Sequence, residues 1–129
     1  MKDIDTRNAM LDAMRRCPDL TVEGLDGGAR PKFEEMQASL LDYLKAFEYA
    51  RTWLSLVPWR TRPNRDCDSY RLKHVIERWS GVYTPNGVCI AAAIHVGLPI
   101  QPCPSGINAW FGIAGSRKWP KVDGMPPCN

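Results

Sequence analysis

The middle of the chain interleaves basic and aromatic residues in a way that suits contact with a polyanion. Arginine pairs with phosphate through two parallel hydrogen bonds and planar rings can stack on bases, so this mixture is typical of a nucleic-acid interface. The basic residues that we expect to make such contacts are Arg60, Arg62, Arg65, Arg71, Lys73 and Arg78. The aromatic residues among them are Trp53, Trp59, Tyr70 and Trp79. The simpler alternative is that Trp53 and Trp79 belong to the core and that the arginines only solvate a face.

The charge is unevenly distributed along the chain. The whole sequence has 17 Lys and Arg against 14 Asp and Glu, a formal net charge of +3. Residues 1–50 hold seven basic and ten acidic residues (−3), residues 51–80 hold seven and three (+4), and residues 81–129 hold three and one (+2). The total is too small to indicate a polyanion partner by itself. The excess of positive charge nevertheless falls in the segment that carries the candidate contacts.

A second chemistry would combine a histidine with a cysteine. A thiolate beside an imidazole is the minimal pair for acyl transfer, so His74 or His95 with Cys67 or Cys89 forms the candidate set. No motif links them, because the sequence has no nucleophile elbow, phosphate-binding glycine loop or zinc-protease pair. Lone histidines and helical cysteines usually serve packing. We therefore expect no enzyme, no catalytic residue, no metal site and no cofactor.

The cysteines also indicate a compartment. There are five of them, an odd number, widely scattered and without a Cys-x-x-Cys pair. This pattern favours reduced thiols over a disulfide framework or a structural zinc. The longest apolar run, residues 88–94, is far shorter than a membrane span, and the N-terminus lacks the apolar stretch of a secretory signal. The expected location is the cytoplasm.

A chain of 129 residues with 44% hydrophobic residues is expected to form one domain with one modest core. Apolar spacing and capping residues predict four helices, at residues 3–16, 31–57, 69–80 and 85–96, with Pro31 in the first turn of the second. Glycine content predicts a loop at 21–30. We expect a mostly α-helical α+β domain with a small C-terminal β-hairpin. Its parts are an N-terminal helical part (1–57), a basic loop (58–68), a helical hairpin (69–97), a β-hairpin (98–115, pairing 98–101 with 107–113) and a tail (116–129).

The helices at 69–80 and 85–96 resemble a helix-turn-helix in their spacing. The second helix argues against that interpretation, because it offers almost no side chains that could hydrogen-bond to base edges and is expected to be buried. Gly87 in its first turn is costly for a helix and predicts close approach of another backbone. On the first helix, Lys73 and Glu77 are expected to form an i,i+4 pair on the outer side.

Three strings carry a resemblance to a known group of proteins. They are Ser69-Tyr70-Arg71-Leu72-Lys73-His74, then Tyr83-Thr84-Pro85-Asn86-Gly87 leading into Ile90-Ala91-Ala92-Ala93, and finally Asn108-Ala109-Trp110-Phe111. This core, residues 68–113, resembles small proteins of phages and integrative elements. The resemblance implies a bacterial mobile element as the genomic context. Small cytosolic proteins of such elements commonly bind DNA, act as regulators, or block a host defence complex.

The sequence therefore predicts a non-enzymatic cytosolic protein that binds nucleic acid, DNA or RNA, mainly through phosphate contacts. One alternative is a protein-binding inhibitor of a host nucleic-acid-handling or defence complex, similar to an anti-CRISPR protein, whose acidic first 50 residues occupy a basic surface. A second alternative is a Cys/His-dependent enzyme. The apolar helices also leave a homodimer open, and no membrane partner is expected.

Overall fold

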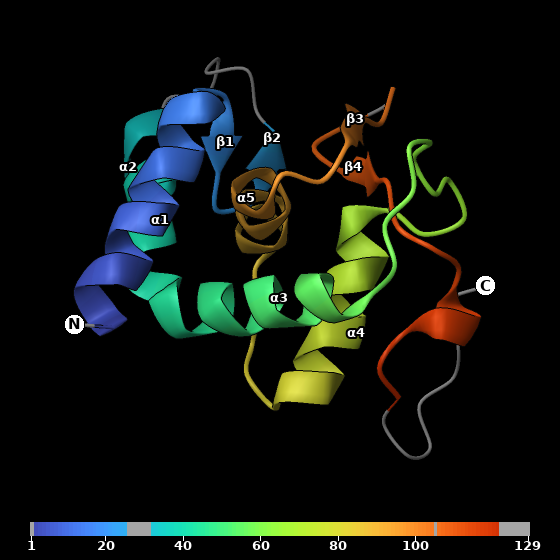
Figure 1. Cartoon of the computed structure of the whole chain (residues 1–129). Coiled ribbons are helices and arrows are strands. Elements are labelled where there is room, and N and C mark those ends of the chain that lie inside the picture. Colours follow the sequence, from blue (N-terminus) through green and yellow to red (C-terminus); the bar gives the residue numbers. More distant parts are fainter. Residues whose placement is uncertain (1, 26–31, 105, 122–129) are drawn as a thin grey trace.

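The computed structural model describes residues 2–25, 32–104 and 106–121, which form the helical domain with a C-terminal hairpin that the sequence predicts (Figure 1). The main elements follow one another along the chain. They are α1 (Lys2–Arg16), β1 (Leu20–Thr21), β2 (Gly24–Leu25), α2 (Phe33–Ala38), the 3-10 helix η1 (Ser39–Tyr43), α3 (Leu44–Leu56), α4 (Ser69–Ser80), α5 (Asn86–Val96), β3 (Ile100–Pro102), β4 (Ala109–Phe111) and the 3-10 helix η2 (Ser116–Lys118).

Helix α5 is the centre of the domain. Figure 1 shows it nearly end-on, with α1, α3, α4 and the two small hairpins around it. Every residue from Asn86 to Ala93 is buried, as expected of a helix that is apolar on all sides. The alanines at 91–93 let neighbouring helices approach closely, and Gly97 ends the helix in the left-handed conformation with a φ of 88°. The prediction of a buried second helix is confirmed.

Helix α4 lies beside α5 and forms as the apolar spacing predicts. Leu72, Val75 and Ile76 are buried in the core. The Asp68 carboxylate caps the N-terminus by accepting a hydrogen bond from the backbone N–H of Arg71 at 3.0 Å. Gly81 ends the helix with a φ of 75°.

The single helix predicted for residues 31–57 is wrong. The chain forms α2, then η1, then α3, and Tyr43 leaves helical geometry with φ −119° and ψ 38°. In Figure 1, α3 runs across the base of the domain at a steep angle to α2, so the 3-10 turn changes the direction of the chain. This redirection buries Leu40 while Phe47 packs in the core. The predicted first-turn residue, Pro31, lies outside the described residues.

The predicted loop at residues 21–30 is also corrected, because β1 and β2 form a short antiparallel pair there. This hairpin is pressed against the start of α5. A Cβ on Gly87 would lie 1.7 Å from the carbonyl oxygen of Thr21, and the Gly87 N–H donates to Val22 O at 3.0 Å. The close backbone approach that Gly87 predicts is therefore confirmed. The predicted C-terminal hairpin is confirmed as β3 and β4, with Ile100 opposite Phe111.

Candidate nucleic-acid interface

The basic loop, residues 58–68, is held against the chain that follows β4. The Arg60 N–H donates to Gly112 O at 2.9 Å, the Asn64 N–H to Phe111 O at 2.7 Å, and the Ala114 N–H to Pro58 O at 2.8 Å. Gly112 allows this contact, because a Cβ there would lie 2.3 Å from Arg60 O. Residues 58–64 are thus paired like an irregular extra strand, which holds the backbone of this part of the loop against the domain.

Trp59 is the one aromatic residue in the sequence of this loop, and 45% of its surface is exposed. Its indole Nε1 donates to the carbonyl oxygen of Leu54 at 2.9 Å, so the polar end of the ring is satisfied by the end of α3. The exposed part of the side chain is therefore apolar ring surface. A half-exposed, fixed ring is suited to stacking on a planar ligand.

A groove of about 640 Å³ opens beside Trp59, and we call it the basic groove. Its lining residues come from two segments, and the structure describes all of them: Pro58, Trp59, Arg60, Ala114, Gly115, Ser116, Arg117 and Lys118. Three of the eight are cationic and none is acidic. The volume lies within the range of about 300–1,000 Å³ that is usual for ligand sites. The groove therefore combines positive charge with an exposed aromatic ring.

The second of the two segments that line the basic groove, residues 114–118, is anchored to the core by Trp119. Its ring is 6% exposed and meets Trp53 edge to face, with 5.3 Å between ring centroids. Its Nε1 donates to Ala114 O at 2.7 Å. This anchor holds η2, and with it Arg117 and Lys118, next to the basic loop. The part of the predicted tail that the structure describes, residues 116–121, is docked on the domain.

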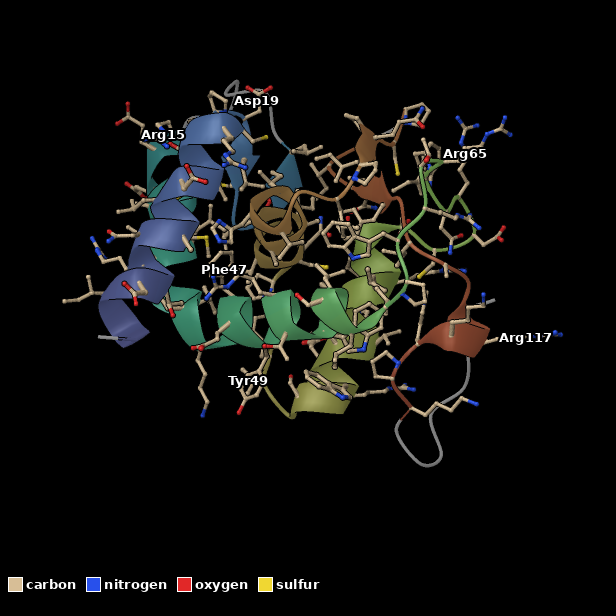
Figure 2. The ribbon with its side chains drawn as sticks, in the orientation of Figure 1. Arg15, Asp19, Phe47, Tyr49, Arg65 and Arg117 are labelled. Atoms are coloured by element: carbon tan, nitrogen blue, oxygen red, sulfur yellow. The ribbon has the colours of Figure 1, made fainter. Side chains whose placement is uncertain are left out.

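Arg62 and Arg65 extend the positive surface beyond the groove. Both are exposed, and Arg62 lies next to Arg60, whose Nε donates to Arg62 O at 3.2 Å. The Arg65 guanidinium lies over the Trp110 ring at 5.0 Å from its centroid and donates to Gln101 Oε1 at 3.4 Å. Figure 2 shows Arg65 and Arg117 projecting from the side of the domain opposite Arg15. We call Arg60, Arg62, Arg65, Arg117 and Lys118 the basic surface.

The three predicted contact residues on α4 are placed differently from those of the loop. Arg71 and Arg78 are exposed, at the first and last turns of the helix. Lys73 is not on the surface, because its side chain is only 8% exposed. The predicted i,i+4 pair forms, with Lys73 Nζ at 3.5 Å from Glu77 Oε1, but the expectation that it lies on the outer side is wrong.

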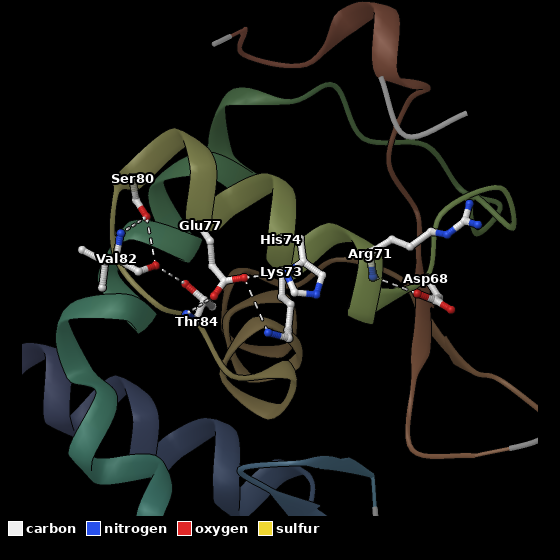
Figure 3. A network of polar contacts seen from close by, with 8 residues as sticks. All are labelled: Asp68, Arg71, Lys73, His74, Glu77, Ser80, Val82 and Thr84. Carbon is white, nitrogen blue, oxygen red and sulfur yellow. Dashed lines mark hydrogen bonds and ion pairs between the residues drawn. The ribbon is translucent and has the colours of Figure 1, made fainter. Parts of the chain in front are cut away.

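Lys73 belongs to a local network that joins α4 to the turn before α5 (Figure 3). Its ammonium lies 5.0 Å from the Tyr83 ring centroid and 5.5 Å from that of Tyr70. Glu77 Oε1, which pairs with Lys73, also lies 2.8 Å from His74 Nδ1. The other carboxylate oxygen, Oε2, accepts a hydrogen bond from the backbone N–H of Thr84 at 3.2 Å. The Lys73 ammonium is thus engaged by Glu77 and by the rings of Tyr70 and Tyr83, and it is not available to a phosphate.

The cysteines give no support to the Cys/His arrangement. Cys89 is completely buried, and this burial raises the pKa of its thiol strongly, so it is not a thiolate near neutral pH. Cys67 is disulfide-bonded, which corrects the expectation that every cysteine is reduced. Cys17 and Cys103 are free, half-buried thiols whose pKa values are raised by burial.

Within residues 2–25, 32–104 and 106–121, no three His, Cys, Asp or Glu side chains are grouped so as to hold a metal ion. In the same part of the chain, no helix has the length and apolar character needed to cross a membrane.

Sequence reasoning located the loop arginines but missed Arg117 and Lys118. These two residues are more than fifty positions away from Arg60 along the chain, and only the pairing of the basic loop with residues 111–114 brings them together. The available signal was weak: a basic pair directly before Trp119, whose ring anchors it.

Comparison with protein-family models, with curated proteins and with solved structures finds no match to this chain.

Proposed function

We propose that this protein binds nucleic acid mainly through phosphate contacts made by the basic surface. The observation that carries the proposal is the basic groove, where Arg60, Arg117 and Lys118 converge from two distant segments with no acidic residue among its lining residues. Like charges brought together cost stability unless a ligand neutralises them. A phosphate backbone neutralises several at once and releases its own counterions.

The acidic residues of the same half of the domain are engaged locally. Those in the described part of residues 58–121 are Asp66, Asp68 and Glu77. Asp68 caps α4, and Glu77 binds Lys73 and His74. By contrast, Glu34, Glu35 and Asp42 are exposed on α2 and η1, in the half of the domain away from the basic surface. This separation of charge orients the basic surface toward a polyanion and increases the rate of encounter.

The expected mode of binding is independent of base sequence. Arginine and lysine side chains at the rim of a loop reach phosphates readily, whereas reading a base sequence requires a helix or strand placed in a groove. Helix α5, the only candidate for such a recognition helix in the predicted helix pair, is buried at the centre of the domain. Arg71 and Arg78, which are exposed on α4, extend the phosphate contacts without contributing base readout.

The origin in a mobile element and a cytoplasmic location remain part of the proposal. The origin rests on the resemblance of residues 68–113 to proteins of phages and integrative elements, and the location rests on the scattered cysteines, of which Cys17, Cys89 and Cys103 are free. The disulfide at Cys67 is unusual for a cytoplasmic protein and is the observation that opposes this location. A host defence protein as partner, the alternative function, makes the opposite binding prediction: no affinity for nucleic acid at low salt.

The test is a fluorescence-anisotropy titration of a labelled duplex of random sequence at low salt. The Arg60→Ala/Arg62→Ala/Arg65→Ala variant removes three charges of the basic surface. The matched control removes three exposed charges elsewhere, on α1 and α3, by Arg7→Ala/Arg15→Ala/Lys45→Ala. Both variants change the net charge by the same amount.

We expect the first variant to bind at least about tenfold more weakly than the wild type, since each lost phosphate contact removes part of the counterion release. The control variant is expected to stay within about twofold of the wild type. Equal losses in the two variants would show that only net charge matters, and absence of wild-type binding would contradict the proposal.

A further inference from the structure

Trp59 separates two concave regions of the surface. It lines the basic groove on one side and, on the other, a second groove of about 630 Å³ between α3 and the end of α5. We call the latter the Arg51 groove. Its lining residues are Glu48, Arg51, Thr52, Ser55, Leu56, Trp59, His95 and Val96. The exposed indole is thus shared by both grooves, and a ligand that lies across Trp59 enters both of them.

The Arg51 groove differs from the basic groove in its chemistry. Arg51 is held over the Phe47 ring, at 5.0 Å from its centroid, and its buried Nε has no hydrogen-bond partner among the described residues. The hydroxyls of Thr52 and Ser55 donate to helix carbonyls one turn back at 3.0 and 2.8 Å, which leaves their oxygen lone pairs as acceptors. Glu48 places a carboxylate on the same wall, so a second phosphate is not favoured there.

The groove therefore combines the Arg51 guanidinium, the hydroxyl acceptors of Thr52 and Ser55 and the apolar edges of Leu56 and Trp59. Leu56 is 56% exposed and adds apolar surface next to the Trp59 ring. Burial and the nearby Arg51 guanidinium lower the pKa of His95, which adds a neutral imidazole at neutral pH. Donors, acceptors and apolar edges in one half-open groove match a nucleobase with its sugar.

We propose that the natural ligand is single-stranded nucleic acid, with a base stacked on Trp59, its phosphates in the basic groove and the base and sugar of the neighbouring nucleotide in the Arg51 groove. This inference rests on the proposed function and names its substrate class. A duplex can supply the phosphates, but its bases are already stacked on one another and cannot stack on Trp59. A single strand presents both its phosphates and its open base faces.

The experiment compares three labelled probes in anisotropy titrations: an oligo-dT and an oligo-rU of about 10 nucleotides, a length within known site sizes, and a duplex of the same length. The key variant is Trp59→Leu, which removes the ring. Trp59→Phe keeps an aromatic face while losing the hydrogen bond to Leu54. Tyr83→Leu removes another exposed aromatic residue, one that lines neither groove.

We expect Trp59→Leu to weaken binding of the single strands by about 5- to 150-fold, the equivalent of one stacked base, and to leave duplex binding within about twofold. Trp59→Phe is expected to retain most of the affinity, and Tyr83→Leu all of it. Arg51→Gln is expected to lower affinity for the single strands only. The ratio of dT to rU affinity then identifies DNA or RNA as the source of the strand.

The outcomes separate the two proposals. Suppose that the loop triple variant loses duplex affinity, while Trp59→Leu either lowers strand and duplex affinity equally or changes neither affinity. The inference about single strands is then wrong, and the proposal of phosphate binding stands. If the triple variant loses nothing, the proposed function is wrong. A wild-type dimer that Trp59→Leu dissociates, seen by sedimentation, would show that a second copy covers Trp59 and would also overturn the inference. Unfolding curves of Trp59→Phe and Trp59→Leu establish that both variants fold.

Discussion

At Gly112, the addition of a single methyl group is expected to push the basic loop away from the rest of the domain. Its backbone accepts a hydrogen bond from Arg60 N–H at 2.9 Å and donates one to Pro99 O at 2.8 Å. In Gly112→Ala the new Cβ would lie 2.3 Å from Arg60 O and 3.0 Å from the Pro99 ring, so the loop must move away. The residue is buried, which leaves no route into solvent for the methyl group.

The size of the effect follows from these contacts. Weakening the two backbone hydrogen bonds costs about 1 kcal/mol in total, and overpacking costs about 1–3 kcal/mol, which together give about 2–4 kcal/mol. With a urea m-value of about 1.5 kcal/mol/M, the unfolding midpoint falls by about 1.3–2.7 M. Gly115→Ala is the matched control, since a Cβ there meets nothing within 4 Å and the backbone is extended. A Gly112→Ala midpoint equal to that of the control would refute the close contact.

Three further predictions test other parts of the structure. Gly87→Ala, whose Cβ would lie 1.7 Å from Thr21 O, is expected to lower the free energy of unfolding by about 3 kcal/mol in urea denaturation, and wild-type stability would contradict the packing of β1 on α5. A native-state thiol titration is expected to label Cys17 and Cys103 and to reach Cys89 only after denaturation, because Cys89 is buried with a raised pKa. Burial lowers the pKa of His95 below its usual value of 6.5, so the unfolded chain takes up a proton at higher pH than the native one. Stability is therefore expected to fall as the pH drops below about 6.5 and to level off below the native pKa, and a His95→Gln variant that keeps the full slope would show that another group is responsible.

The helices that the sequence located well are those whose signals are local. In α4 the apolar residues recur at helical spacing, Asp68 supplies the cap and Gly81 the stop, and all three signals agree with the structure. Gly87 also predicted a tertiary contact, because glycine destabilises the first turn of a helix and close approach of another backbone explains its presence there. The small hairpin at β3 and β4 was likewise bounded by prolines and indicated by aromatic content.

The elements that the sequence did not predict depend on contacts between distant segments. Apolar spacing continues through residues 33–56, so it does not reveal that η1 turns the chain between α2 and α3. The two-residue strands β1 and β2 are too short for an alternating pattern, and they form where the chain meets α5. Lys73 sits beside an apolar stripe, and only the rings of Tyr70 and Tyr83 decide that its ammonium is covered.

The same distinction holds for the candidate interface. Arg60, Arg62 and Arg65 were predicted because they lie close together in one loop. Arg117 and Lys118 join them through tertiary pairing, which no local pattern encodes. The position of Trp59 between two grooves likewise depends on the ends of α3 and α5 and on the chain after β4.

The most direct test of phosphate binding by the basic surface is the slope of log affinity against log salt concentration for the duplex. The five cations of the basic surface together with Arg71 and Arg78, each neutralising one phosphate, predict a slope of about −6.3 for the wild type, and the loss of Arg60, Arg62 and Arg65 predicts a slope of about −3.6. Parallel lines for the two proteins, or a wild-type slope near zero, would contradict the assignment of the basic surface as the site of phosphate contact.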